Sequence, residues 1–493
     1  MSVVARQGFK YSLIGYFGFL LGTISAIFVF PLDIKFYGKL QYILPTAEML
    51  LPIVVFGLSF SNVKFFLQTQ KDGKHQNFLS LSLVGILINF IIFLVLFFAF
   101  FYLFPQFKEW KIWEMKRLIL PLILVLALSS VFNKYISNFK RIVVPNIFEN
   151  IFPKIANLGA FVLFFWVGLS EKGAYGFFFA MFVIAFLGYI FYANKLEKIQ
   201  PNFSTDYLQK DNLWREVLNY SFFGFLGNLG SYIAFRVDKF MIGEFISFEE
   251  NGAYSIILAI LSIIMIPQMG LFNISAPLIN KSISENNYEE LDRFHKKTSL
   301  TLFFLGAILF SCILVGFPYL TFILPNNGDA LRIASPVVWI LGSAMLFDLA
   351  TGFNGHIISL SKYFRFNIVV MMFLAVTTIV LNYIFITKTN FGIVGIALAT
   401  AISLTLFNLI KIAFNYWKFK VSPISIEMVY TSILCTLGIT LSIILPESKN
   451  NFLNLIYKPA VVLAIIGTGN YFMKIYPLEK YFNKNFFRSL MKF

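Results

Sequence analysis

The sequence predicts an all-α integral membrane protein, and two observations lead to this fold class. The 493-residue chain is 58% hydrophobic and only 13% charged, with a mean hydropathy of +0.76. Such a composition does not divide into one apolar core and a polar surface. Apolar runs long enough to cross about 30 Å of hydrocarbon recur along the whole chain. Together these observations exclude an ordinary soluble globular protein.

The apolar runs predict fourteen transmembrane helices. The first run is too long for a removable signal peptide and has no small-residue cleavage site, so it is expected to be retained. The predicted spans cover, in order, residues 11–30, 42–60, 78–104, 116–137, 143–167, 174–194, 217–236, 252–274, 298–323, 336–358, 368–386, 394–414, 427–446 and 457–476.

Two stretches that lie 209 residues apart share one pattern. Residues 11–18 and 220–227 both read Tyr-Ser-x-x-Gly-x-x-Gly, and the apolar segments that they open end in acidic turns at Asp33 and Asp238. The chain is therefore predicted to be internally duplicated, with two pseudo-symmetric halves of six helices. Duplicated helix bundles with a site at the interface of the halves are typical of secondary transporters.

The longest polar break in the chain lies between the sixth and seventh spans. We therefore expect a first lobe at 1–194 (spans one to six), a cytoplasmic linker at 195–216 and a second lobe at 217–420 (spans seven to twelve). Residues 421–493 would add an extra helix pair, spans thirteen and fourteen, and a cytoplasmic tail. A second polar segment, 284–297, is expected to form a short helix on the cytoplasmic side, either interfacial or solvated.

The charges predict the orientation. The net charge of +16 does not indicate nucleic-acid binding, because no basic stretch is interleaved with aromatics on a soluble module. With the N-terminus inside, roughly two thirds of the 40 Lys and Arg residues, Lys411 among them, fall in cytoplasmic segments. The positive-inside rule then places both termini in the cytoplasm of a bacterial cell. The loop between spans three and four is the exception, because it carries Lys108, Lys111, Lys116 and Arg117.

Span five contains a polar stripe that predicts a cavity. Asn146, Asn150, Lys154 and Asn157 recur at spacings of four, four and three, so they share one helix face. The functional interpretation is a water-filled cavity in which Lys154 binds an anion. The alternative is that the amides bond to neighbouring helices and that Lys154 snorkels or pairs with Glu149.

Span seven repeats this pattern, with Asn228, Tyr232 and Arg236 at four-residue steps and Asp238 just beyond. Arg236 could bind phosphate oxygens with two nitrogens, which suits a pyrophosphate head group. The alternative is an ion pair of Asp238 with Arg236 or Lys239.

Ionisable residues inside spans are candidates for ion coupling, because each costs about 2.5–3.5 kcal/mol on insertion scales. In span ten, Asp348 and His356 lie on or beside a face with two glycines, and Glu48 lies in span two. A buried carboxylate near a histidine could titrate near neutral pH, so Asp348, His356, Glu48 and Asp238 are candidates for H⁺ or Na⁺ coupling. A structural pair is the alternative.

The chain has no phosphate loop, no His/Cys metal cluster and no nucleophile elbow, so an enzyme, a catalytic residue, a cofactor and a metal site are not expected. Both cysteines, Cys312 and Cys435, fall in apolar spans and indicate no disulfide framework. Energy for transport would come from an ion gradient or from the gradient of the substrate itself.

Three stretches resemble the polysaccharide exporters and oligosaccharide-lipid flippases of the multidrug/oligosaccharidyl-lipid/polysaccharide superfamily. The first is Arg-Val-Asp-Lys-Phe-Met-Ile-Gly at 236–243, followed by Gly-Ala-Tyr at 252–254. The second is Leu-Asn-Tyr-Ile-Phe-Ile at 381–386, followed by a small-residue stretch at 392–403. The third is the N-terminal Tyr-Ser with spaced glycines. The similarity extends over roughly residues 1–420.

The resemblance implies a V-shaped pair of six-helix lobes around a central cavity that opens alternately to the two membrane faces. It implies a flippase for an oligosaccharide on polyprenyl pyrophosphate, with membrane lipid, a polysaccharide polymerase and glycosyltransferases as further partners. The alternatives are a peptidoglycan lipid-precursor flippase, which also has fourteen spans, and an ion-coupled multidrug exporter. From another class, a membrane polymerase or ligase of lipid-linked sugars remains open.

Overall fold

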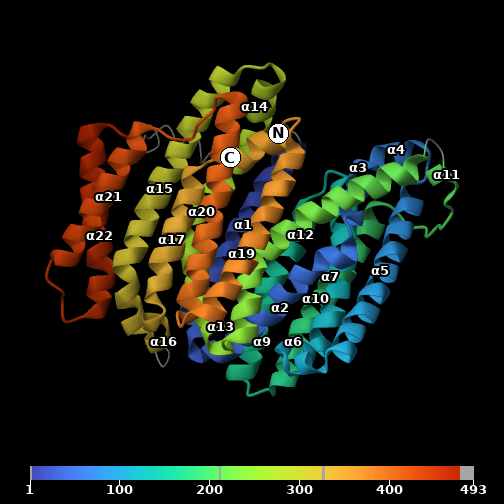
Figure 1. Ribbon diagram of the computed structural model, residues 1–493, viewed down its shortest axis with the longest axis horizontal. Helices are drawn as coiled ribbons and strands as arrows, with labels where there is room; N and C mark the ends of the chain where they lie inside the picture. Colours follow the sequence, from blue (N-terminus) through green and yellow to red (C-terminus); the bar gives the residue numbers. More distant parts are fainter. Residues whose placement is uncertain (1–2, 210–211, 325–327, 478–493) are drawn as a thin grey trace. The chain divides into compact units, whose positions relative to one another are not determined.

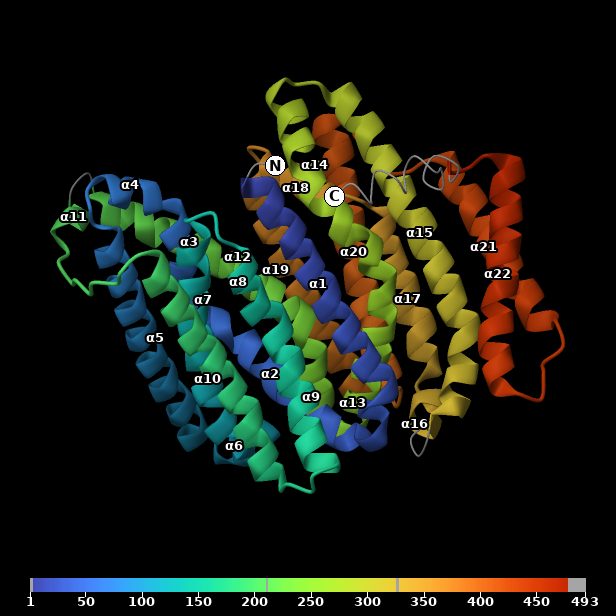
Figure 2. The same cartoon turned by 180° about the vertical axis from the view of Figure 1, so that it is seen from behind.

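The computed structural model describes residues 3–209, 212–324 and 328–477, and helices form its secondary structure (Figures 1 and 2). Short 3-10 turns, η1, η2 and η5, and one π-helical turn, η3, connect some of them; they cover Phe30–Asp33, Pro105–Glu109, Ser262–Met265 and Ile147–Ile151. No β-strand occurs in the described ranges. The α-helices are α1 (Val3–Phe28), α2 (Ile34–Val55), α3 (Leu58–Lys64), α4 (Phe66–Lys71), α5 (His75–Leu103), α6 (Lys111–Glu114), α7 (Lys116–Ser137), α8 (Val143–Asn146), α9 (Phe152–Phe165), α10 (Glu171–Leu196), α11 (Asp206–Gln209), α12 (Leu213–Phe245), α13 (Phe248–Leu261), α14 (Ile266–Ser284), α15 (Tyr288–Ile323), α16 (Gly328–Ile333), α17 (Ser335–Ala350), α18 (Asn354–Leu360), α19 (Phe364–Lys388), α20 (Gly392–Phe419), α21 (Ile426–Ile444) and α22 (Asn451–Met473).

The predicted all-α membrane class is confirmed, but the count of fourteen spans is not. Among the described residues, eleven helices are long and apolar enough to cross a membrane, and two bent pairs raise the number to thirteen if each pair is one span. The predicted span that this set omits, 217–236, lies within α12. Polar side chains, Asn219, Asn228 and Arg236 among them, interrupt the apolar character of that helix. The chain is a multi-pass membrane protein.

The second predicted span is bent because of its prolines and a glycine. Pro45 and Pro52 lie inside α2, which ends where Phe56 and Gly57 adopt left-handed backbone angles of φ 45° and φ 73°. The chain from Phe30 to Val55 meets α3 at 59°. A Cβ atom at Gly57 would lie 2.1 Å from the carbonyl oxygen of Ser221 on α12. Glycine is therefore required both for the turn and for the close approach of α12.

The chain divides into two compact units. Unit 1 combines Met1–Ala259 with Arg365–Ser403, and unit 2 combines Ile260–Phe364 with Leu404–Phe493. This division by internal contacts does not test the predicted lobes at 1–194 and 217–420, which stay a prediction.

Glycines of the two repeated phrases occupy comparable positions in unit 1. A Cβ atom at Gly18 of α1 would lie 3.2 Å from the carbonyl oxygen of Asn150, in the fifth predicted span. A Cβ atom at Gly227 of α12 would lie 3.7 Å from Ile368, in the eleventh. Each glycine thus faces the fifth predicted span of its own half, as an internal repeat predicts.

In unit 2 the helix pair α21 and α22 packs beside α15 (Figure 1). The buried Lys458 of α22 donates hydrogen bonds to the carbonyl oxygens of Ser442 and Leu445 at 2.6 and 2.7 Å. A cation at these last carbonyls stabilises the C-terminus of α21. The expected separate helix at 284–297 is wrong, because α15 begins at Tyr288 and continues without a break into the predicted ninth span.

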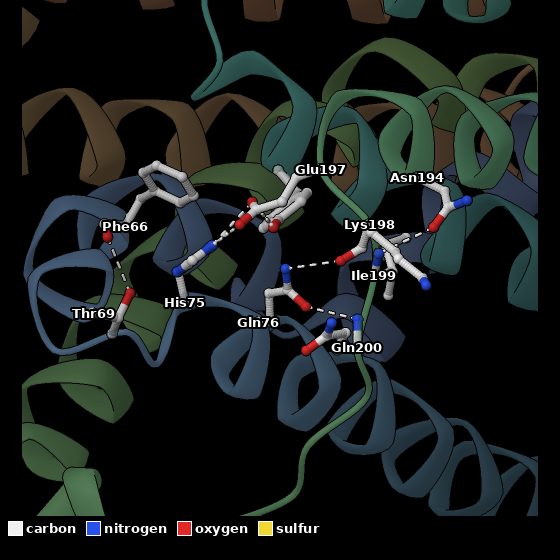
Figure 3. A network of polar contacts seen from close by, with 10 residues as sticks. Phe66, Thr69, His75, Gln76, Asn194, Glu197, Lys198, Ile199 and Gln200 are labelled. Atoms are coloured by element: carbon white, nitrogen blue, oxygen red, sulfur yellow. Dashed lines mark hydrogen bonds and ion pairs between the residues drawn. The ribbon is translucent and has the colours of Figure 1, made fainter.

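The connector after α10 is fastened to the start of α5 (Figure 3). His75 Nε2 lies 2.8 Å from Glu197 Oε1, and the hydroxyl of Tyr135 donates to Glu197 Oε2 at 3.1 Å. Gln76 donates to the carbonyl oxygen of Lys198 at 3.1 Å and accepts from the backbone N–H of Gln200 at 2.7 Å. These bonds fix the path of the chain between α10 and α11.

Candidate functional site: a cationic cluster in unit 1

Most of the polar stripe predicted in span five is used for helix contacts. Asn150 donates to the side chain of Asn146, which in turn donates to the carbonyl oxygen of Tyr11 on α1 at 2.8 Å. Asn157 donates to the carbonyl oxygen of Pro153 at 2.7 Å and accepts from Gln41 at 3.4 Å. Asn146 and Asn157 therefore bond to neighbouring helices, whereas Asn150 bonds within its own predicted span.

Lys154 is different, because its charge interacts with Glu48 and Arg236 as well as with Glu149. The alternative pairing of Lys154 with Glu149 is not what the geometry favours, since Glu149 Oε2 accepts a hydrogen bond from Asn133 at 3.0 Å. Gly22 on α1 lies against the stem of Lys154, where a Cβ atom would be 3.5 Å from Cγ. Lys154 thus belongs to a cluster that spans α2, α9 and α12.

Arg236 forms the centre of this cluster. Its Nε atom donates to Glu48 Oε2 at 2.8 Å, and the guanidinium carbon lies 5.3 Å from the ring centre of Tyr232, one turn earlier on α12. Among the described residues, no hydrogen bond joins the two terminal amino groups of Arg236 to another side chain. The predicted alternative, an Arg236–Asp238 pair, is wrong. Asn228 shares this face of α12, but its side chain makes no hydrogen bond to another described residue.

Lys239 completes the cluster. Its Nζ atom donates to Gln41 Oε1 on α2 at 2.6 Å, and its charge interacts with those of Arg236, Glu48 and Lys154. Three cations thus lie near Glu48, and the charges of Glu149 and Asp238 also reach Lys154 and Lys239, respectively. An excess of cations inside a transmembrane bundle favours binding of an anion, and a free guanidinium fork suits phosphate oxygens.

Asp238 lies in a separate polar cage. The hydroxyl groups of Tyr254 and Thr400 donate to Asp238 Oδ2 at 2.6 Å each, and the amide of Asn382 donates to Oδ1 at 2.9 Å. The four residues come from α12, α13, α19 and α20, and the Asp238 side chain is buried. The predicted alternative, a direct Lys239–Asp238 ion pair, is not formed, since Lys239 donates to Gln41.

Two of the sequence stretches that carried the family resemblance therefore meet at one carboxylate. The residues Tyr254, Asn382 and Thr400 lie in those stretches, but the sequence did not single them out. Their shared property, a donor side chain within an apolar span, could have identified them.

Unit 2 contains a second ionisable group within a predicted span, the half-buried Asp348. Asp348 Oδ1 accepts a hydrogen bond from Asn408 of α20 at 2.8 Å, and its charge interacts with that of Lys411, one turn further along α20. Lys411 is only 8% exposed. Its side chain is therefore enclosed by neighbouring residues, and the side of the membrane on which it lies stays a prediction. His356 packs edge-on against Phe353 and also experiences the charge of Lys411, so Lys411 lies near both ionisable residues predicted in span ten.

No group of three His, Cys, Asp or Glu residues that could hold a metal ion occurs in the described part of the chain. The arrangement in unit 1 can bind an anion and can exchange one ion pair for another, which are the properties of a transport site.

Comparisons with known proteins relate the chain to two families of sequences and to solved structures of transporters. The sequence family described as "Polysaccharide biosynthesis protein" matches residues 4–281, and the family described as "MatE" matches residues 225–384. No match was found among curated protein sequences.

Solved structures of transporters share the fold. A structure described as the lipid II flippase MurJ in an inward closed conformation is 15% identical, covers 94% of this chain and 98% of its own, and has a TM-score of 0.72. An outward-facing multidrug resistance MATE family transporter is 12% identical, with 85% and 96% covered and a TM-score of 0.55. A transporter of the same superfamily from Pyrococcus furiosus is 12% identical, with 85% and 95% covered and a TM-score of 0.57. The predicted resemblance to this superfamily is confirmed.

Proposed function

Because the chain belongs to the family of polysaccharide biosynthesis proteins, we propose that it is a flippase for an oligosaccharide carried on polyprenyl pyrophosphate. It moves this cargo across the bacterial cytoplasmic membrane by alternating access, for the assembly of a surface polysaccharide. Both chain ends lie in the cytoplasm, and a polysaccharide polymerase and glycosyltransferases are its partners.

The observation that supports this proposal is the cationic cluster. Lys154, Arg236 and Lys239 outnumber Glu48, while Asp238 is held by its own donors and Glu149 accepts a hydrogen bond from Asn133. A pyrophosphate must cross a layer of low dielectric constant, where an unpaired anion is costly. The terminal amino groups of Arg236 bind the pyrophosphate, while Glu48 keeps Arg236 in position and competes with the cargo for it.

Ion coupling belongs to the same proposal. Asp348 with Lys411 and the caged Asp238 are the carboxylates through which an H⁺ or Na⁺ gradient acts, and Glu48 is the carboxylate closest to the cargo site. We further propose lobes at 1–194 and 217–420, with the helix pair beyond 420 outside both.

A second candidate is a peptidoglycan lipid-precursor flippase, which the fold likeness to the lipid II flippase favours. Its cargo also carries a pyrophosphate, so the cationic cluster suits both and the sugar distinguishes them. A multidrug exporter is less favoured, because an excess of cations repels the cationic drugs that many such exporters carry. A polymerase or ligase would form new glycosidic bonds, which analysis of the products reveals.

The test uses the full chain in proteoliposomes with a fluorescent polyprenyl-pyrophosphate-linked oligosaccharide. Arg236→Ala removes an interaction worth about 1.5–3 kcal/mol and should lower affinity roughly tenfold to hundredfold. Arg236→Lys should be partly active, because lysine lacks the two-pronged geometry. Arg215→Ala, which changes an exposed arginine on the same helix, should behave like the unchanged protein. Normal transport by Arg236→Ala/Lys154→Ala would contradict the site. Transport of the peptidoglycan precursor but not of the oligosaccharide would favour the second candidate.

A further inference from the structure

A hollow of ≈ 450 Å³ opens at the end of α5 that is opposite to His75. It is lined by Phe98, Ala99 and Tyr102 of the last turns of α5, Lys108 of η2 and Trp113 of α6. This end of α5 closes a candidate membrane span, so the hollow lies where the hydrocarbon layer meets the head groups. All five residues belong to unit 1.

The wall of the hollow is held in place by aromatic packing. The Trp113 ring lies 4.7 Å from the ring of the buried Phe101 and 6.2 Å from that of Phe97, measured between ring centres, and it meets Phe98 edge-on at 5.9 Å. On the outer side, Tyr102 is 79% exposed and continues an apolar face of α5. The hollow therefore offers a fixed aromatic wall that adjoins a lipid-facing helix surface.

Two cations approach the same ring without a carboxylate partner. The ammonium groups of Lys108 and Lys116 lie 5.7 and 3.8 Å from the ring centre of Trp113, and Lys116 also donates to the carbonyl oxygen of Trp113 at 2.9 Å. Within the described residues, neither lysine forms an ion pair. Lys108 lines the hollow and Lys116 approaches the same ring, so an anion at this ring would be attracted by both charges.

Lys111, in the same basic loop, has a structural role instead. Its Nζ atom donates to the carbonyl oxygen of Gly243 at the end of α12, and the carboxylate of Glu244 accepts from the backbone N–H groups of Lys111 and Ile112 at 2.6 and 3.1 Å. The contacts of Lys111 with α12 thus explain only one of the basic residues of this loop. In the part of the chain that the structure describes, Lys108 and Lys116 make no such contact with α12.

We propose that this hollow binds one anionic phospholipid of the surrounding membrane. The phosphate lies beside Lys108 and Lys116, the glycerol backbone rests against Trp113, and an acyl chain follows Phe98 and Tyr102 along α5. The apolar wall and the opening at the end of a span select a lipid over a soluble anion. The site is separate from the cationic cluster, so binding of the phospholipid does not depend on which cargo the protein transports.

The experiment measures quenching of tryptophan fluorescence in the purified full chain by brominated phosphatidylglycerol. For each protein, the quenching of its Trp113→Phe derivative is subtracted. The difference then reports the quenching of Trp113 alone. Lys108→Gln should weaken phosphatidylglycerol binding about fivefold, the expected effect of one lysine near an anionic head group. Lys172→Gln, an exposed lysine at the start of the candidate span Glu171–Leu196, should change nothing.

Equal quenching by brominated phosphatidylcholine, or unchanged affinity in Lys108→Gln/Lys116→Gln, would overturn the proposal. Displacement of the brominated phospholipid by soluble glycerol phosphate at similar concentrations would also overturn it, because the acyl chain would then contribute nothing. Retention of phosphatidylglycerol by the unchanged protein in native mass spectrometry, with loss in the double variant, would support it.

Discussion

Asp238 and Lys239 are neighbours in α12, but their side chains serve different clusters. Asp238 accepts hydrogen bonds from Tyr254, Asn382 and Thr400, whereas Lys239 donates to Gln41 on α2. One turn of helix thus joins a carboxylate cage to the cationic cluster. A change in either cluster can therefore reach the other through α12.

Removing the charge of Asp238 should destabilise unit 1. In Asp238→Asn, the new NH₂ group replaces one of the two oxygens and faces at least one donor, so at least one hydrogen bond to a charged group, worth about 1.5–3 kcal/mol, is lost. Thermal unfolding in detergent should show a clearly lower midpoint than for Thr400→Ser, which keeps the hydroxyl. Equal midpoints for the two variants would show that the cage does not stabilise the fold.

Neutralising Glu48 should strengthen anion binding. In Glu48→Gln, Arg236 loses its competing carboxylate, so we expect roughly tenfold tighter binding of geranylgeranyl pyrophosphate, about 1.4 kcal/mol. Release should be slower, and transport should not increase in proportion. Equilibrium binding to the purified protein checks this, with the exposed Glu109→Gln as the control. Weaker binding by Glu48→Gln would mean that the carboxylate chiefly positions Arg236.

The pair of Asp348 and Lys411 should show strong energetic coupling. Lys411→Met leaves the half-buried carboxylate of Asp348 with Asn408 as its donor and should be destabilising, by less than the about 3–5 kcal/mol of a fully buried pair. Asp348→Leu/Lys411→Met removes both charges and should be less destabilised than Lys411→Met alone. A double-mutant cycle on thermal unfolding measures this, and additive effects would contradict the pairing.

The sequence predicted the helices and several site residues, but not their pairing. Apolar run length predicted thirteen of the spans that the structure supports, and spacing of three or four along a helix placed Lys154 and Arg236 on polar faces. The Arg236–Glu48 contact joins residues 188 positions apart, and helical periodicity carries no information about such contacts.

The proximity of Lys411 to Asp348 was missed for a different reason. Lys411 lies near the end of an apolar run, where basic residues usually face the cytoplasm, so its charge was used only to predict the orientation. The spacing of Asn408, Lys411 and Asn415 by three and four residues is the same kind of stripe that identified span five. That stripe, together with the need of half-buried Asp348 for a cation, would have indicated its position.

The orientation of the chain can be tested with introduced cysteines. In a Cys312→Ala/Cys435→Ala background, Lys172→Cys and Asn390→Cys should react with a membrane-impermeant thiol reagent added to intact cells. Lys71→Cys should be protected until the cells are opened. These three positions are exposed in the structure, so protection reports the side of the membrane. Labelling of Lys71→Cys in intact cells would reverse the predicted topology.

Acid should release the connector after α10 from α5. Burial raises the pKa of Glu197, but the hydrogen bond and charge of His75, with bonds from Gln76 and Tyr135, lower the pKa by more, so it lies below its ordinary value of 4.5. A carboxylate with a lowered pKa contributes stability above pH 4.5, and this contribution is lost as the pH falls through the folded value.

The backbone amides of Gln200 and Asn202 report this release, because they donate to Gln76 and to Ser80 on α5. Their hydrogen exchange, corrected for intrinsic rates, should accelerate below about pH 4.5. Glu197→Gln should show the faster exchange already at neutral pH, whereas Asp206→Asn, which changes another acid of the same connector, should retain the pH dependence. If Glu197→Gln exchanged with the unchanged pH profile, the connector would be held by its backbone contacts, and the His75–Glu197 pair would not control it.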